Sequence, residues 1–152
     1  MASDISVRAA RLGEAEALTA LCLRSKAHWG YDDAFMRLSR ASLTVNDAEI
    51  ASGCVLVAER QGLVFGVARV EPDGELGLMF VDPRTINRGV GRALFEAAVG
   101  LARRLGARRM TILADPNAVP FYERMGASFV SHAPSDAIPG RTLPLYEYDL
   151  SQ

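Results

Sequence analysis

Alternating and helical patterns of apolar residues follow one another along the chain, and together they predict a fold that mixes strands with helices. Residues 4–9 alternate as a short strand does, and residues 13–27 place apolar side chains at helical spacing behind an acidic first turn. Residues 31–39 favour a second short helix. The polar stretch that follows is irregular, with a helical turn begun by Thr44 or Asn46.

Three consecutive strands come next. Residues 54–60, 63–71 and 75–82 are rich in apolar and β-branched residues, and Gln-Gly and Pro-Asp-Gly turns separate them. Because these connections are short, neighbouring strands have to run antiparallel. The middle of the chain therefore predicts an antiparallel meander.

Helical spacing returns after Pro83. A long helix is predicted from about Gly89 to Leu105, and Gly106 closes it. The remaining elements of this half are a strand at 108–114, a short helix at 117–125, and two last strands at 127–132 and 143–149.

The strand at 75–82, the long helix and the strand at 108–114 form a β-α-β unit, so these two strands should be parallel. The complete pattern predicts one α/β (α+β) domain over residues 1–152. Its central sheet is mixed and mostly antiparallel, with about six or seven strands and helices on both faces.

Composition narrows the class of protein. The chain has 152 residues, 49% of them apolar and 23% charged, which is ordinary globular usage. Its net charge is −1, so nucleic acid is not expected as a partner. No apolar run approaches a membrane span, and the first residues lack the apolar core of a signal peptide, so we expect a cytoplasmic protein with no membrane partner.

Rare residue types exclude two kinds of site. The one lysine, Lys26, is followed by alanine, so the Gly-Lys-Ser/Thr of a P-loop is missing. Two histidines and two scattered cysteines do not make a structural zinc site, and we expect no metal. The two cysteines also fit a reducing compartment.

The segment at 80–95, FVDPRTINRGVGRALF, has the composition of a phosphate-binding loop. Gly89 and Gly91 let the backbone approach a ligand at the start of a long helix, where partial positive charge favours an anion. The arginines Arg84, Arg88 and Arg92 flank them. A glycine turn that merely opens a helix is the alternative. A dinucleotide site is disfavoured because Leu94 stands where its third glycine belongs.

Two motifs of this chain resemble the GNAT superfamily, the acyl-CoA-dependent N-acetyltransferases. Residues 86–91, INRGVG, are similar to the family's Arg/Gln-x-x-Gly-x-Gly/Ala loop, although Ile86 replaces the leading Arg/Gln. Residues 117–126, NAVPFYERMG, are similar to a shortened form of its Asn-and-Phe-Tyr helix. The resemblance extends over about residues 4–149, and it implies that the parallel strands splay apart around the cofactor.

The resemblance also implies a set of residues that bind acetyl-CoA. Backbone groups near Met79, Phe80 and Val81 would pair with the pantetheine arm. The other expected contacts come from the glycine loop and the short helix: Arg84, Arg88, Gly89, Val90, Gly91, Arg92, Asn117, Phe121 and Tyr122. A cap residue is the alternative for Asn117, and a core aromatic is the alternative for Tyr122.

Acetyl transfer to an amine needs a base for the ammonium proton and a proton donor for the departing thiolate. The resemblance makes Tyr122 the acid and Glu75 the base. Many members of the family use an ordered water as the base, and Glu75 would then be a solvated residue at the strand edge. Catalysis is predicted to proceed by direct attack in a ternary complex.

The acceptor is expected to be a primary amine of a small molecule or a peptide. His28, Trp29 and Tyr31 lie between the first two predicted helices, where the family builds its acceptor pocket, and a buried turn cluster is their alternative. Arg141 could bind an acceptor carboxylate or serve the loop structurally. The rival functions are a CoA-binding regulatory module without catalysis and an adenine-nucleotide-binding protein, and the family also allows a homodimer.

Overall fold

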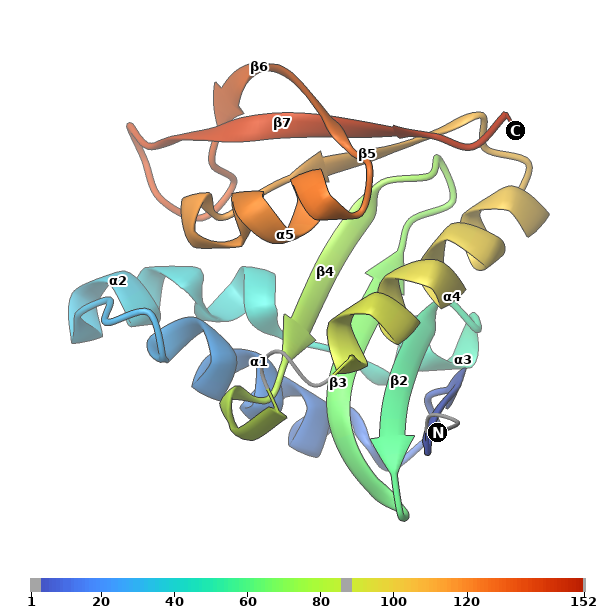
Figure 1. Cartoon of the computed structure of the whole chain (residues 1–152). Helices are drawn as coiled ribbons and strands as arrows, with labels where there is room; N and C mark the ends of the chain where they lie inside the picture. The colour runs from blue at the N-terminus through green and yellow to red at the C-terminus, as the bar shows by residue number, and fades with distance from the viewer. Residues whose placement is uncertain (1–3, 86–88, 152) are drawn as a thin grey trace.

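The computed structural model describes residues 4–85 and 89–151 (Figure 1). Three 3-10 turns, at Arg40–Leu43, Pro83–Thr85 and Pro116–Ala118, connect the regular elements. In chain order the helices and strands are β1 (Ile5–Ala9), α1 (Ala15–Ala27), α2 (Asp33–Ser39), α3 (Asp47–Ala51), β2 (Val55–Arg60), β3 (Leu63–Val70), β4 (Leu76–Val81), α4 (Val90–Arg104), β5 (Arg109–Leu113), α5 (Val119–Arg124), β6 (Ser128–Pro134) and β7 (Thr142–Asp149).

The strands form two antiparallel sheets. The first has the order β1-β2-β3-β4 and the second the order β5-β7-β6. The predicted α/β fold is confirmed, including the meander over β2, β3 and β4. The single central sheet that the sequence predicts is divided into two, because β4 and β5 do not pair within the described residues. The turn between β2 and β3 has the predicted Gln61-Gly62 pair, and both residues have positive φ, 53° and 79°, as a two-residue hairpin of this twist requires.

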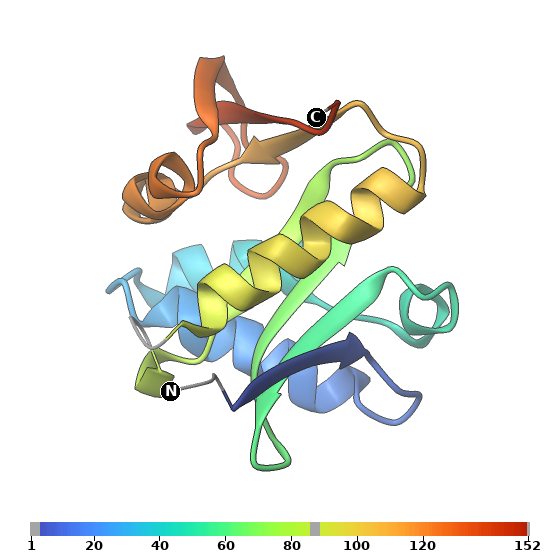
Figure 2. The same ribbon diagram turned by 45° about the vertical axis from the view of Figure 1, so that its right-hand side comes forward.

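Strands β4 and β5 lie between the two halves of the molecule and diverge. They are in contact, yet no ladder joins them in the described part of the chain. Their starts are held together, because a Cβ on Gly74 would lie 2.7 Å from the carbonyl oxygen of Arg109. Figures 1 and 2 show the strands separating toward their carboxyl ends. The predicted parallel pair is therefore a wedge that opens on one side of the molecule.

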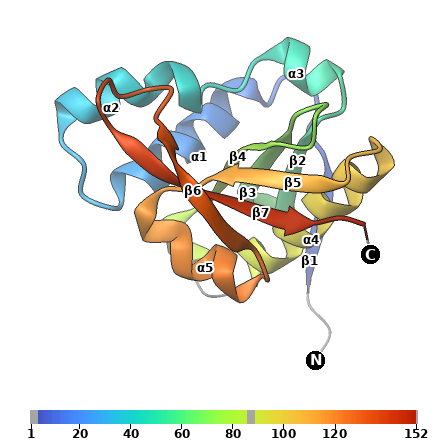
Figure 3. The same cartoon turned by 90° about the horizontal axis from the view of Figure 1, so that it is seen from above.

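Helices cover both faces of the first sheet (Figure 3). On one face, Leu94, Phe95 and Ala98 of α4 are buried against β2, β3 and the second sheet. On the other face, Leu18 and Leu21 of α1 belong to a second core cluster with residues of β2, β3 and β4. The open wedge therefore has a rigid helix-covered sheet on one side.

The connections are more regular than the sequence suggests. Asn46 caps α3 in a reciprocal capping box with Glu49, so the predicted helical turn begins at Asn46 and not at Thr44. The predicted helix at 117–125 is divided into a 3-10 turn and the shorter α5, because Asp115 caps the turn and Pro116 and Pro120 cannot donate backbone hydrogen bonds. No helix in residues 4–85 and 89–151 is long and apolar enough to cross a membrane.

Candidate active site

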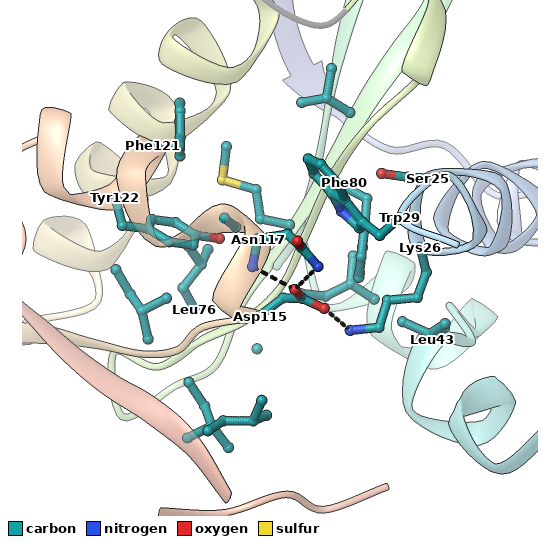
Figure 4. Close-up of a pocket in the computed structure, with 18 of the residues that line it drawn as sticks. Ser25, Lys26, Trp29, Leu43, Leu76, Phe80, Asp115, Asn117, Phe121 and Tyr122 are labelled. Atoms are coloured by element: carbon teal, nitrogen blue, oxygen red, sulfur yellow. Dashed lines mark hydrogen bonds and ion pairs between the residues drawn. The ribbon is translucent and has the colours of Figure 1, made fainter. Parts of the chain in front are cut away.

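A cleft of about 670 Å³ fills the wedge between the two sheets (Figure 4). Its walls come from β4, the N-terminus of α4, the end of β5, α5, the end of α1 and the loop between β6 and β7. The lining combines apolar side chains with a few convergent polar groups, which is the usual character of a small-molecule site.

At one end of the cleft the chain presents backbone in place of side chains. We call residues Gly89–Arg92 the glycine turn. Gly89 caps α4 with a φ of 87°, a conformation that disfavours other residues, and a Cβ on Gly91 would lie only 3.0 Å from the ring of Phe121. The 15-residue helix α4 begins here, so its first backbone N–H groups and the partial positive charge of its dipole lie at this end of the cleft. This end of the cleft therefore fits an anionic group such as a phosphate.

The arginines around the glycine turn differ in position. Arg92 lines the cleft, while Arg84 does not. Both ends of the Arg84 guanidinium bind Asp82, with Nε 3.0 Å from Oδ1 and Nη2 2.9 Å from Oδ2. Arg24 adds a third contact to this buried carboxylate, and the Arg84 hydrogen bond in particular holds the pKa of Asp82 far below its usual range. Arg84 thus anchors the segment after β4, and Arg88 lies outside the described residues.

The exposed edge of β4 supplies a second backbone surface. β3 occupies one side of β4, and on its other side no strand pairs with it among residues 4–85 and 89–151. Met79, Phe80 and Val81, the residues expected to meet the pantetheine arm, all line the cleft. An extended ligand could pair with this edge as a further strand would. Val90, by contrast, points into the core under α4 and does not line the cleft.

Tyr122 lies on α5, where its ring packs against Phe95 and Phe121. The side chain is buried, and burial, followed by the charge of Asp115, raises the pKa of its phenol well above the usual range. Its hydroxyl makes no hydrogen bond within the described part of the chain. No fully buried side-chain oxygen or nitrogen there lacks a partner, so this hydroxyl is accessible from the cleft that Tyr122 lines. The hydroxyl therefore reaches the cleft protonated and available (Figure 4).

Glu75 lies directly before β4, on the opposite wall. It lines the cleft and also a smaller adjoining cavity of about 310 Å³. Burial, followed by the negative charges of Asp73, Glu71 and Asp136, raises the pKa of its carboxyl. A carboxylate with a raised pKa is a stronger base than an exposed one, so this environment suits proton removal.

A polar cluster that the sequence did not reveal joins α1 and α2 to the second sheet. Asp115 is at its centre: Lys26 Nζ lies 2.6 Å from Oδ2, the Tyr31 hydroxyl donates to Oδ2 at 2.8 Å, and Asn117 Nδ2 donates to Oδ1 at 3.0 Å (Figure 4 shows Lys26 and Asn117). We call this set the Asp115 cluster; its members are Lys26, Tyr31, Phe35, Asp115, Asn117 and Arg141. Burial alone would raise the pKa of Asp115, but the hydrogen bonds from Lys26 and its other donors lower it.

The predicted acceptor residues are only partly brought together. Trp29 lines the cleft with 43% of its surface exposed, whereas His28 is exposed outside the lining and touches the edge of Trp29. Tyr31 does not line the cleft, and its hydroxyl holds the Asp115 cluster together instead. Asn117 lines the cleft and donates to Asp115 and Tyr31, while its backbone N–H is capped by Asp115.

Two other chemistries find no support in the described residues. No group of three or more His, Cys, Asp and Glu side chains over 4–85 and 89–151 is arranged to hold a metal ion. Cys22 is buried in the core, where burial raises the pKa of its thiol to about 12, and neither it nor Cys54 lines the cleft. A thiolate nucleophile is therefore not available from this part of the chain.

Comparison with solved structures identifies the architecture. The match to a GCN5-related N-acetyltransferase from Rhodopseudomonas palustris covers 97% of this chain and 96% of that protein, with a TM-score of 0.80 and 25% identity. The match to yncA from Salmonella typhimurium, solved with its cofactor acetyl-CoA, covers 99% of this chain and 96% of that protein, with a TM-score of 0.71 and 22% identity. The match to the PaiA N-acetyltransferase of Thermoplasma acidophilum, in complex with coenzyme A, covers 97% of this chain and 99% of that protein, with a TM-score of 0.78 and 13% identity.

Sequence comparison agrees with the structural one. A search of curated proteins found no match. The family model for the acetyltransferase (GNAT) domain matches residues 35–136, which include β4, the start of α4 and all of α5. The family match covers the segment that contains the glycine turn and the strand β4 of the wedge, and the structural match covers the whole fold. The chain therefore belongs to the GNAT family of acetyltransferases.

Proposed function

We propose that this protein is an N-acetyltransferase that moves the acetyl group of acetyl-CoA to a primary amine of a small molecule or a peptide. The observation that carries the proposal is a single cleft with the glycine turn at one end and Tyr122 and Glu75 on its walls. One cleft thus combines an anion site, an apolar channel, a proton donor and a base.

The residues present fit acetyl-CoA as the cosubstrate. The amide groups of the glycine turn and the Arg92 side chain would hold the pyrophosphate, and the free edge of β4 at Met79–Val81 would pair with the arm. Acetyl-CoA supplies a thioester, whose acyl group reacts with an amine. The absence of a Cβ at Gly91 leaves room for the ring of Phe121 beside the turn, since a Cβ there would lie 3.0 Å from that ring.

Glu75 and Tyr122 divide the proton chemistry. An alkylammonium has a pKa near 10, so the acceptor must lose a proton before it can react, and Glu75 accepts that proton directly or through a water. The Tyr122 phenol keeps its own proton, because burial and the Asp115 charge raise its pKa, and it donates a hydrogen bond or the proton to the departing sulfur. The two groups therefore work in opposite protonation states at neutral pH.

Direct attack in a ternary complex is the simplest course for this arrangement. The described lining of the cleft contains no cysteine, and the four serines in it, Ser25, Ser39, Ser42 and Ser135, have no histidine among the described lining residues. A covalent acyl-enzyme would need an activated nucleophile of that kind. The amine and the acyl donor would instead meet in the cleft.

The test is a thiol-release screen with acetyl-CoA and a panel of polyamines, aminoglycosides, amino acids and peptides with free N-termini. We expect at least one class to give thiol release that depends on both the amine and the enzyme. Stabilisation of the fold by acetyl-CoA with no turnover on any class would contradict the proposal and leave a CoA-binding module.

A further inference from the structure

Arg141, in the loop between β6 and β7, has a guanidinium that is held in place before any ligand arrives. Its Cζ lies 4.9 Å from the centre of the Phe35 ring and 5.3 Å from that of the Tyr31 ring. These two rings stack on each other at 3.9 Å, and Arg141 Nη2 donates to the Tyr31 hydroxyl at 3.0 Å. The two rings beside it and this hydrogen bond restrict the Arg141 side chain, and Arg141 lines the cleft.

The charge of Arg141 is not compensated by a neighbour. In the Asp115 cluster the single carboxylate pairs with Lys26 at 2.6 Å, so two cations share one anion and the cluster keeps one positive charge. Residues 4–85 and 89–151 place no carboxylate within ion-pair distance of Arg141, although Asp136 belongs to the same loop. Arg141 lines the cleft with its charge available to a ligand.

The donors that remain on Arg141 suit a planar anion. A guanidinium has five N–H groups, and among the described residues only one hydrogen bond from it is made. A carboxylate fits such a fork with two parallel hydrogen bonds, which neither an amide nor a hydroxyl can reproduce. The cleft also contains Glu75 and Asp136, which attract an ammonium group. The described lining therefore offers charges of both signs to a zwitterion.

We propose that Arg141 binds the carboxylate of the acceptor, and that the acceptor is a small amine of the amino-acid class. This inference rests on the proposed acetyltransferase function and makes its acceptor more specific. Arg141 is then a specificity-determining residue, and Tyr31 and Phe35 are positioning residues that act through it. Glu75 lines the same cleft and would accept the proton of the ammonium group of that molecule.

The test compares amino acids with their primary amides and with the amines left by decarboxylation, all with acetyl-CoA and thiol detection. The amides keep the amine and the side chain and lose only the anion. We expect kcat/KM for the amino acids to exceed that for both analogues by about 30-fold or more, the lower end for a partly buried charge pair. Arg141→Met should remove this preference: kcat/KM for the amino acids should fall by about 30-fold or more, and kcat/KM for the decarboxylated amines should fall by much less.

Two matched variants and a fold control sharpen the comparison. Arg141→Lys keeps the charge without the fork and should recover only part of the preference. Arg37→Met removes an exposed arginine of α2 that does not line the cleft, and it should leave the preference intact. Thermal melting of each variant reports folding, and if Arg141→Met does not fold, the wild-type comparison of amino acid with amide still decides.

Each outcome has one meaning. Equal kcat/KM for amino acids and amides, or an Arg141→Met effect that is the same on both, would overturn the inference. Turnover restricted to amines without a carboxylate would overturn it as well, while leaving the acetyltransferase function standing. Turnover of no amine at all would contradict the proposed function itself, and the acceptor class with it.

Discussion

The two ends of the cleft are built in different ways. The anion end is the glycine turn, four consecutive residues at the start of α4 that offer backbone amides. The other end is the Asp115 cluster, whose side chains come from α1, α2, the segment before α5 and the loop after β6, with hydrogen-bonded partners up to 110 residues apart in the sequence. The first is encoded locally and the second only by the tertiary fold.

This difference has consequences for substitution. At the anion end the two glycine positions disfavour a side chain, because a Cβ on Gly91 would lie 3.0 Å from the ring of Phe121 and Gly89 has a positive φ. In the Asp115 cluster the identity of each side chain carries the chemistry, and a change there alters charge and hydrogen bonding without blocking the cleft. Substitutions at the anion end should therefore act by steric blocking, whereas substitutions in the Asp115 cluster should act by changing which acceptor binds.

The largest effect is expected at Gly91. Gly91→Glu places bulk and negative charge where the phosphates bind, and like charges at such a distance cost several kcal/mol, so affinity for acetyl-CoA should fall roughly 10³-fold. The stabilisation of about 2.7 kcal/mol that acetyl-CoA gives at 100 times its Kd should vanish from thermal melts. The matched control is Gly100→Glu in the same helix, where the nearest atom to a Cβ is Arg104 Nη1 at 3.5 Å. If both variants lose binding equally, the anion site is not at the glycine turn.

The next effect is expected at Tyr122. Tyr122→Phe keeps the ring packing against Phe95 and removes the hydroxyl, so kcat should fall about 10²-fold, the low end of general-acid effects. Affinity for acetyl-CoA should be nearly unchanged. Tyr148→Phe, on a ring that also packs on Phe95 but lies outside the cleft lining, is the control. Wild-type kcat in Tyr122→Phe, measured where chemistry limits the rate, would return Tyr122 to the role of a core aromatic.

Much of the fold can be predicted from the sequence because its signals are local. The hairpin turn at Gln61-Gly62, the glycine turn and the aromatic pair of α5 each occupy a few neighbouring residues. The Asp115 cluster cannot be predicted in this way, since the carboxylate and its partners Lys26, Tyr31 and Arg141 meet only after both sheets have formed.

The sequence also misjudged where some side chains point. Arg84 flanks the glycine turn in the chain, yet the buried Asp82 two residues earlier captures its guanidinium. His28 follows α1 next to Trp29, but the end of the helix directs it to solvent. The one signal for the missed cluster in the sequence is that the chain has a single lysine, Lys26, among 17 basic residues. In the structure that lysine has only 11% of its side chain exposed.

A change of stability is expected for the Asp115 cluster itself. Lys26→Met leaves the Asp115 carboxylate buried with its hydrogen bonds and without its cation, which should cost about 2 kcal/mol, less than a fully unpaired buried charge. The pKa of Asp115 is lowered in the folded state, so the stabilisation is present at neutral pH and is lost as pH falls through that value. Denaturant unfolding should therefore show a difference between the proteins that shrinks in acid, and an equal difference at all pH values would mean that the charge is not involved.

The smallest effect is expected at Glu75. Glu75→Gln should lower kcat by only about 10-fold, since a water can take over part of the work of the base. The acid limb of the pH profile should disappear, because the amide of Gln does not titrate. The charge of Asp136 is one of the causes that raise the pKa of Glu75. Asp136→Asn should therefore move the acid limb to lower pH while the maximal kcat stays the same. A limb that does not respond to either variant would assign the base to solvent.

The most direct test of the account is one mass-spectrometric experiment on the intact system. The wild-type protein is incubated with acetyl-CoA alone and with acetyl-CoA plus the amine panel, and the masses of the protein and of the amines are measured. Direct transfer in a ternary complex predicts an N-acetylated amine, no mass change of the protein, and loss of product in Gly91→Glu. An acetylated protein, or a panel that stays unmodified although acetyl-CoA binds, would contradict it.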